Sequence, residues 1–164
     1  MELKRVVITG LGAITPIGNT VPEYWDSLCK GVGGAGMITR FDASKFKSRI
    51  ACEVKNFNPE DYFDRKEARK LDLFEQFAIV AADEAIKDSG INKDNTDFVE
   101  VGVIFASGIG GIESLFNDNV EYARGDGTPR VSPFTIPKLL PDLAAGQISI
   151  KYGFHGPNIC TVTA

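Results

Sequence analysis

The sequence predicts an α/β fold with a mixed, mostly parallel sheet in a single domain, and one observation supports each part of this prediction. Twice in the chain, a short β-branched run leads into a glycine-rich turn and then into a helical pattern. Strands that alternate with helices form layered folds in which the strands run mostly parallel. In addition, no low-complexity linker divides the chain, so we expect residues 1–164 to form a single domain.

The first of these repeats lies at the N-terminus. Residues 5–9 are a β-branched run closed by the Gly-x-Gly turn at 10–12, as expected for a buried parallel strand that ends in a tight turn. Residues 20–30 begin with a capping threonine and an early proline, and Gly31 follows them. This pattern predicts a short helix.

The best-marked helix of the sequence starts at Asp64. Glu67 follows three residues later, in a variant of the capping box that marks the start of a helix. Apolar side chains then recur at helical spacing from Leu71 to Ala85, and Gly90 ends the pattern. We therefore expect one continuous helix between Asp64 and Gly90.

The second repeat begins with residues 99–106, which predict another buried strand. The glycine cluster at 107–111 closes this strand and opens a helix that continues through Glu121. Neither glycine turn matches a dinucleotide site, because Thr15 and Glu113 stand where the third glycine belongs. We therefore expect no cofactor, and assign the glycines to tight turns beneath close-packed helices.

The C-terminal part predicts one more helix and one more strand. Pro141 and Gly153 flank the helix in the proline-first, glycine-last order, and Gly146 within it suggests close packing against a neighbour. Residues 158–164 are β-prone and end without a polar tail. We therefore expect the sequence to be part of a longer protein.

Composition excludes several classes of protein. With 43% hydrophobic and 24% charged residues the chain is typical of a globular protein, and no apolar run approaches the ~20 residues that cross a bilayer. The N-terminus lacks the apolar stretch of a signal peptide, so we expect a cytoplasmic location and no membrane attachment. A net charge of −4 argues against nucleic-acid binding.

The cysteines and the single histidine offer no metal site. Cys29, Cys52 and Cys160 have no C-x-x-C spacing, and with His155 alone they provide no zinc ligand set. We expect all three cysteines to be free buried thiols, with Cys160 packed in the core. We expect His155 to have no catalytic role.

A basic cluster lies in the first two turns of the best-marked helix. Its members are Arg65, Lys66, Arg69 and Lys70. The partial positive charge of a helix N-terminus disfavours cations there, so the cluster suggests a docking site for an anionic partner. The alternative is a solvated helix face whose cations pair with nearby carboxylates, namely Asp61, Asp64 and Asp72.

Five motifs follow one another along the chain: residues 5–20, 64–70, 107–111, 132–134 and 156–164. Together they resemble the condensing-enzyme family of thiolase fold, the β-ketoacyl-[acyl-carrier-protein] synthases, and most of all its bacterial synthase II type. The resemblance covers the whole chain. It implies that residues 1–164 are an incomplete N-terminal domain, half of a thiolase-like layered α-β-α-β-α fold whose C-terminal half is absent.

For the parent protein, the resemblance implies a decarboxylative Claisen condensation of an acyl thioester with malonyl-acyl-carrier-protein in fatty acid chain elongation. The nucleophilic cysteine of the family is expected immediately after Ala164, and two histidines and a lysine are expected in the C-terminal half. This chain is therefore expected to hold no catalytic residue and to be inactive alone. The resemblance implies no metal, no cofactor and a homodimer.

The resemblance also implies binding roles for residues of this chain. The positions that match those receiving the acidic helix of acyl carrier protein are Lys66, Arg69 and Lys70, with Arg130 as a weaker candidate. Ile109 matches a residue that bounds the acyl-chain pocket, and Ile136 matches one that reaches this pocket from the partner subunit. The expected partners are acyl carrier protein, malonyl and acyl thioesters, and a second copy of the protein.

Two other functions remain open at this point. One is a non-catalytic partner subunit of the chain-length-factor kind, in which the nucleophile is replaced and the fold only shapes the tunnel. The other is a polyketide ketosynthase. The residue that follows Ala164 separates the first of these from a condensing enzyme, because only the enzyme requires a cysteine there.

Overall fold

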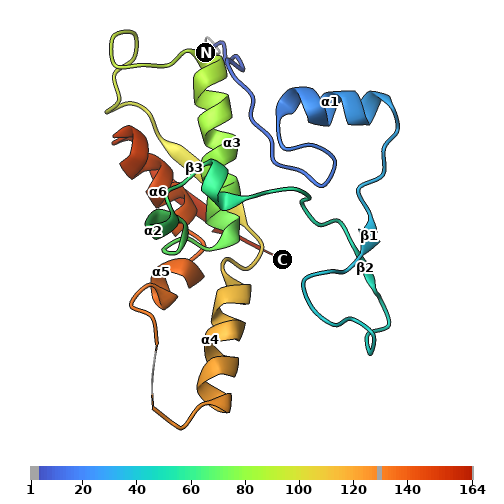
Figure 1. Cartoon of the computed structure of the whole chain (residues 1–164). Coiled ribbons are helices and arrows are strands. Elements are labelled where there is room, and N and C mark those ends of the chain that lie inside the picture. Colours follow the sequence, from blue (N-terminus) through green and yellow to red (C-terminus); the bar gives the residue numbers. More distant parts are fainter. Residues whose placement is uncertain (1–3, 129–130, 164) are drawn as a thin grey trace. The chain divides into compact units, whose positions relative to one another are not determined.

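The computed structural model describes residues 4–128 and 131–163, which form two compact units (Figure 1). The first unit consists of the chain up to Asn58 together with Val80–Gly90, and the second of Pro59–Ile79 together with the chain from Ile91 onward. In chain order the elements are α1 (Val21–Cys29), β1 (Gly36–Met37), β2 (Ile50–Ala51), η1 (Pro59–Asp61), α2 (Arg65–Ala68), α3 (Leu73–Ser89), β3 (Val103–Ser107), α4 (Ile112–Arg124), α5 (Thr135–Leu139), α6 (Leu143–Tyr152) and β4 (Asn158–Val162).

In the first unit, the predicted strand at residues 5–9 is wrong. Val6 is 90% exposed and Ile8 is 83% exposed, and no described residue pairs with this run as a strand. A strand needs a neighbour that satisfies its backbone groups, and local sequence does not supply one. The glycines that follow do serve close packing, because a Cβ atom at Gly12 would collide with the carbonyl oxygen of Ala81 in α3.

Carboxylates of α3 hold the backbone of the N-terminal segment. One oxygen of Glu84 accepts the Ala13 N–H at 2.9 Å and the other accepts the Val21 N–H at 2.9 Å. Asp88 accepts the Leu11 N–H at 3.0 Å. These bonds satisfy backbone N–H groups that have no strand partner. Side chains of α3 therefore accept hydrogen bonds that a neighbouring strand would otherwise accept.

The predicted helix at residues 20–30 is confirmed as α1. The Thr20 side chain accepts the Glu23 N–H at 3.4 Å, and the Glu23 carboxylate accepts the Asn19 N–H at 2.9 Å. These reciprocal bonds resemble a capping box and satisfy donors that a helix start leaves unpaired. The helix ends before Gly31, whose φ of +67° is a left-handed conformation that glycine adopts readily.

In the second unit, the long helix predicted from Asp64 is divided in two. Asp64 caps α2 by accepting the N–H groups of Lys66 and Glu67, both at 2.8 Å. A second cap then starts α3, because Asp72 accepts the Phe74 N–H at 3.2 Å and donates its own N–H to Glu75 at 2.7 Å. The Asp-x-x-Glu pattern therefore occurs twice, and each copy begins a separate helix.

A parallel sheet of β3 and β4 lies in the second unit. Val103 pairs with Asn158, and the register continues to Ser107 with Val162. The strand predicted at 99–106 starts later than expected, and its burial is one-sided, because Ile104 is 74% exposed. Helix α6 lies beside β3 in Figure 1 and packs against both strands. The α/β class and the parallel pairing predicted from the sequence are confirmed.

The C-terminal helix is confirmed as α6, although it begins two residues after Pro141. Gly153 ends it with a φ of +73°. Ala144, Ala145 and Ile148 of α6 are buried and form part of the core of this unit. The expectation for Gly146 is wrong, because a Cβ atom there would meet no other atom within 4 Å.

The three cysteines are free, but they are not buried as predicted. Cys29 and Cys52 are exposed, and Cys160 is partly exposed within β4. Cys160 pairs with Phe105 on the face opposite to the exposed Ile104 and Ile159, and this face is only partly covered. Separately, no helix in residues 4–128 or 131–163 is long and apolar enough to cross a membrane.

Candidate functional site

The basic segment, residues 65–70, comprises α2 and the start of the linker to α3. Lys66, Arg69 and Lys70 are all exposed there. Because α2 has only four residues, these cations do not lie at the N-terminus of a long helix, as the sequence suggested. The unfavourable helix field that drew attention to them is therefore small.

The cations of this segment have few carboxylate partners. Arg65 approaches Glu60 at 3.9 Å, in a pair so exposed that it contributes little. Asp64 accepts the backbone N–H groups described above. Within the described residues, Lys66, Arg69 and Lys70 form no ion pair. The alternative in which the cluster is neutralised by neighbouring acids therefore lacks support.

The structure brings the basic segment to a second sequence motif. The Lys70 ammonium lies 5.8 Å from the centroid of the Phe134 ring, within the range of a cation–π contact. Phe134 belongs to the motif at residues 132–134 and directly precedes α5. Two of the five motifs thus meet on this surface. Arg130, the weaker candidate cation, lies outside the described residues.

A buried polar network lies beneath the basic segment. Gln76 is 6% exposed, and its side-chain amide donates hydrogen bonds to the carbonyl oxygens of Ala68 at 3.0 Å and Leu71 at 3.2 Å. The Asp72 carboxylate accepts the Ser114 hydroxyl at 2.5 Å and so ties the linker to α4. From the sequence, Asp72 was expected only as a possible ion-pair partner of the basic cluster, and no role was predicted for Gln76 or Ser114.

Glu75 is the most deeply buried member of this network, at 1% exposure. Burial raises the pKa of its carboxyl to about 7, although the hydrogen bond from the Asp72 N–H opposes the shift. The nearby Asp72 carboxylate raises the pKa further, and the Lys138 ammonium of α5 lowers it. The group therefore titrates near neutral pH.

The glycine turn after β3 is packed against the end of α5. Gly110 has a φ of +81° and donates its N–H to the Ser107 hydroxyl oxygen at 2.9 Å. A Cβ atom at Gly111 would collide with the carbonyl oxygen of Lys138, and the Gly111 N–H donates to the Leu139 carbonyl at 3.2 Å. Only glycine allows this close approach.

The two predicted pocket residues, Ile109 and Ile136, are not brought together in an enclosed pocket. Ile109 follows the end of β3 and is 57% exposed, and Ile136 lies on α5 and is 59% exposed. The described part of the chain therefore leaves both side chains open on the surface.

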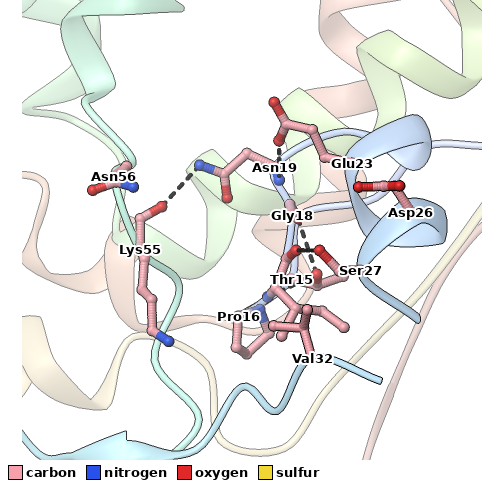
Figure 2. A pocket seen from close by; sticks show the side chains of 11 residues that line it. Thr15, Pro16, Gly18, Asn19, Glu23, Asp26, Ser27, Val32, Lys55 and Asn56 are labelled. Atoms are coloured by element: carbon pink, nitrogen blue, oxygen red, sulfur yellow. Dashed lines mark hydrogen bonds between the residues drawn. The ribbon is translucent and has the colours of Figure 1, made fainter. Parts of the chain in front are cut away.

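A separate cavity of about 440 Å³ lies in the first unit (Figure 2). Figure 2 shows the Asn19 amide directed toward the Lys55 carbonyl, to which it donates at 2.9 Å. The full lining is Thr15, Pro16, Ile17, Gly18, Asn19, Glu23, Asp26, Ser27, Val32, Lys55 and Asn56. No sequence motif for ligand binding marked these residues.

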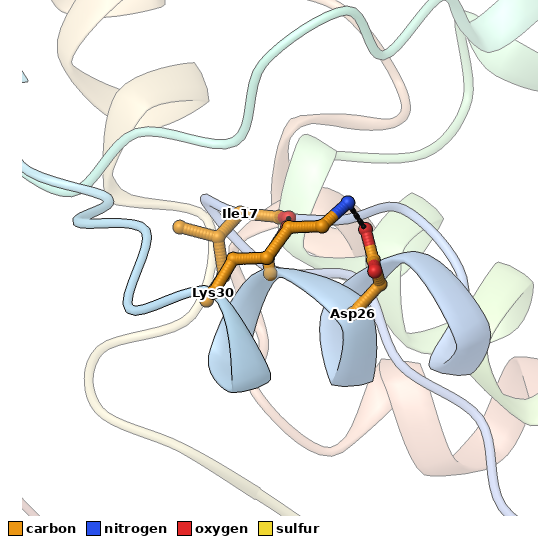
Figure 3. Close-up of polar contacts among 4 residues, drawn as sticks. Ile17, Asp26 and Lys30 are labelled. Carbon is orange, nitrogen blue, oxygen red and sulfur yellow. Dashed lines mark hydrogen bonds and ion pairs between the residues drawn. The ribbon is translucent and has the colours of Figure 1, made fainter.

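The acidic groups of this cavity already have partners. Asp26 pairs with Lys30 at 2.6 Å (Figure 3), and the Glu23 carboxylate accepts the Asn19 N–H. The side chains of Asp26 and Lys30 are 61% and 66% exposed, so their attraction is weak in water. The Ser27 hydroxyl donates to the Ile17 carbonyl at 2.6 Å. We assign no chemistry to this cavity.

Solved ketosynthases share this fold. The ishigamide ketosynthase/chain length factor matches with a TM-score of 0.79 at 26% identity, over 96% of this chain and 39% of that chain. A second match is to a chain in the structure of a complex, with a TM-score of 0.73 at 27% identity, over 93% of this chain and 40% of that one. The complex is a type II polyketide synthase acyl-carrier protein with its ketosynthase bound to the hexaketide. The fold is therefore that of a thiolase-like ketosynthase domain.

The family is shown by sequence as well. Residues 3–164 match the N-terminal domain of β-ketoacyl synthases, and the chain belongs to that family. It is 50% identical over 161 residues to 3-oxoacyl-[acyl-carrier-protein] synthase 2 of Staphylococcus aureus strain N315. It is 48% identical over 166 residues to the enzyme of the same name from Synechocystis. The matches cover 98% and 100% of this chain, which spans 39% of the length of both relatives.

Proposed function

We propose that the chain is the N-terminal domain, residues 1–164, of a 3-oxoacyl-[acyl-carrier-protein] synthase of fatty acid elongation. The observation that carries this proposal is the 50% identity with a synthase 2 over 98% of the chain. Identity to the polyketide-type neighbours is 26% and 27%. This difference favours fatty acid elongation over a polyketide ketosynthase or a chain-length factor.

The proposed reaction has two stages. A cysteine thiolate first attacks the acyl-carrier thioester, the bond between the acyl carbon and the carrier sulfur breaks, and the carrier leaves as a thiolate that takes a proton from water. Malonyl-carrier protein then loses CO₂, and the electron pair left on its methylene carbon attacks the acyl–cysteine thioester. A carbon–carbon bond forms and the thiolate is released.

We propose that the nucleophile follows Ala164 and is not part of this chain. Cys160 is a poor candidate for the role. It lies within β4, and its thiol is 3.7 Å from the Thr161 carbonyl oxygen. A nucleophilic cysteine is instead expected at a helix N-terminus, where the helix field favours the thiolate and backbone N–H groups stabilise an oxyanion.

We propose that the basic segment receives acyl carrier protein through Lys66, Arg69 and Lys70. Support comes from their exposure and from the absence of ion-pair partners for them among the described residues. The similarity to a ketosynthase in complex with its acyl-carrier protein also supports this assignment. On this proposal the protein works in the cytoplasm alongside its carrier-protein substrate.

We further propose that Ile109 and Ile136 bound the acyl chain in a homodimer. Their exposure supports this, because an alkyl chain gains about 0.8 kcal/mol for each methylene that such side chains bury. The β3–β4 sheet also leaves an apolar face uncovered, since Ile104 and its register partner Ile159 are 74% and 48% exposed. The other half of a thiolase-like fold would cover this sheet face, and a second subunit would complete the wall at Ile109 and Ile136.

The test is an assay of the full-length protein, meaning this chain with whatever its gene encodes beyond it. Supplied with an acyl-carrier thioester and malonyl-carrier protein, it should release CO₂ and form a 3-oxoacyl product. Replacing the residue after Ala164 with alanine should abolish product. A full-length protein that binds carrier protein but forms no product, and has another residue at that position, would identify a chain-length-factor-like subunit instead.

A further inference from the structure

We infer that Gln76 is a positioning residue for the docking of acyl carrier protein, holding the linker that carries Arg69 and Lys70. This inference rests on the proposed function of the basic segment. Gln76 is only 6% exposed, so its own side chain is not on the surface that would meet a partner. It acts through the backbone of the segment. None of the functional motifs in the sequence pointed to this residue.

The hydrogen bonds of Gln76 bracket the two cations. Its amide nitrogen donates to Ala68 on one side of Arg69 and Lys70, and to Leu71 on the other side. One rigid planar group therefore fixes both ends of this stretch. The orientation of the amide follows from the chemistry, because the reverse orientation would bring its oxygen against two carbonyl oxygens.

The other contacts of this region act on helix starts or on side chains; the Lys70–Phe134 contact, for example, involves the ammonium and not the backbone. Asp72 caps α3 and bonds Ser114, so it fixes the start of the helix rather than the cations. The Lys70 N–H donates to Glu67 at 2.9 Å, which only closes the last turn of α2. Leu71 is 6% exposed and anchors the linker by its side chain. Among the described contacts, the side-chain hydrogen bonds that join the backbone of residues 68–71 to α3 are the two that Gln76 donates.

Gln76 also carries an unfavourable feature. Its side-chain oxygen is buried and has no hydrogen-bond partner among the residues that the structure describes. An acceptor buried without a donor is costly, and a methionine of similar length would avoid that cost. The two donated bonds must offset it, which argues that the position of the linker matters.

Holding the linker in place should lower the conformational entropy that is lost when carrier protein binds. Cations held in one arrangement bind a partner without first losing conformational freedom, whereas cations on a loose linker must be ordered during binding. Loss of the Gln76 bonds should therefore weaken carrier-protein binding. It should spare the chemistry on thioesters that do not use the basic segment.

The experiment compares Gln76→Met with the wild-type full-length protein. Both donated bonds are lost while side-chain length is kept, so the KM for an acyl-carrier-protein substrate should rise about fivefold with kcat unchanged. The kinetics with the matching acyl-coenzyme A thioester should not change. Amide hydrogen exchange at residues 69–72 should become faster. Ile79→Val is the matched control, because Ile79 is a buried α3 residue, 3% exposed, whose side chain makes no bond to the linker.

The outcomes separate this inference from the docking proposal. If charge reversal of Lys66 and Arg69 raises the carrier-protein KM but Gln76→Met does not, the inference is wrong and docking stands. If the charge reversal also has no effect, the docking proposal fails and the inference fails with it. Equal losses with carrier-protein and coenzyme A substrates, or unchanged hydrogen exchange at 69–72, would also overturn the role of Gln76.

Discussion

At the scale of single residues, polar groups at the start of α3 determine where this helix begins, which the apolar pattern does not reveal. Glu75 is an acid in the core, and its position was not predicted because the helical pattern only marked which residues are apolar. It lies at the third position after Asp72, where its carboxylate caps the helix start. The cost of this cap is a buried group that is charged above neutral pH.

The effect of Glu75 on stability has a definite sign. Its pKa is about 7 in the folded state, against an ordinary value of 4.5, so the folded state holds a proton that the unfolded state has lost between these values. The free energy of unfolding therefore falls as pH rises from 4.5 to about 7 and stays lower above that range.

The substitution Glu75→Gln keeps an oxygen for the Asp72 N–H without the charge, so it should stabilise the full-length protein at pH 8, by up to about 3 kcal/mol. At pH 5 the variant and the wild type should unfold at similar temperatures. Thermal unfolding at both pH values measures this. A gain of equal size at pH 5 and pH 8 would contradict the assignment.

At the scale of helices and strands, the sequence correctly predicted those features that depend on interactions between neighbouring residues. Helix α1 and its cap, the end of α6 at Gly153 and the glycine turn after β3 were all predicted from neighbouring residues. The division of the long helix was missed because the capping box at Asp64 was joined to the apolar pattern that starts only at Leu71, after α2 has ended. The deciding signal was the cap at Asp72, which a search for repeated capping boxes would have found.

The basic segment is the element whose function is most directly testable. Reversing the charges in Lys66→Glu/Arg69→Glu should raise the KM for carrier-protein substrates at least about tenfold at low salt, because opposite surface charges steer association. The difference should narrow at high salt, since exposed charges are screened. Small thioesters should react normally.

The matched control is Lys87→Glu/Lys93→Glu, which changes the net charge equally at two other exposed lysines. This variant should behave like the wild type with both kinds of substrate. If it weakens carrier-protein use as much as the reversal in the basic segment, the effect belongs to the overall charge and not to a docking site.

At the scale of the whole molecule, the sequence predicted the family and the α/β class, and the matches confirm both. The predicted pocket residues could be placed on β3–α4 and α5, but their enclosure could not, because it depends on surfaces distant in sequence. The strand at residues 5–9 failed for the same reason. Pairing between strands is decided by a partner rather than by β-branched residues alone.

The uncovered sheet face should dominate the behaviour of the isolated chain. Residues 1–164 expressed alone should associate or aggregate, because Ile104 and Ile159 lie exposed side by side in the register. Ile104→Thr/Ile159→Thr should reduce this association in light scattering. A sharp thermal transition of a monomer, independent of concentration, would contradict the expectation.

The contact between Gly111 and the Lys138 carbonyl has a consequence for how such a domain can diversify. A methyl group at residue 111 would strike that carbonyl, whereas the Ile109 side chain, two residues earlier, faces open space and is 57% exposed. Mutational tolerance therefore changes abruptly within one turn. Randomising residue 109 should therefore yield folded variants, and on the proposal that Ile109 bounds the acyl chain their acyl preferences should differ, while Gly111 stays sterically fixed.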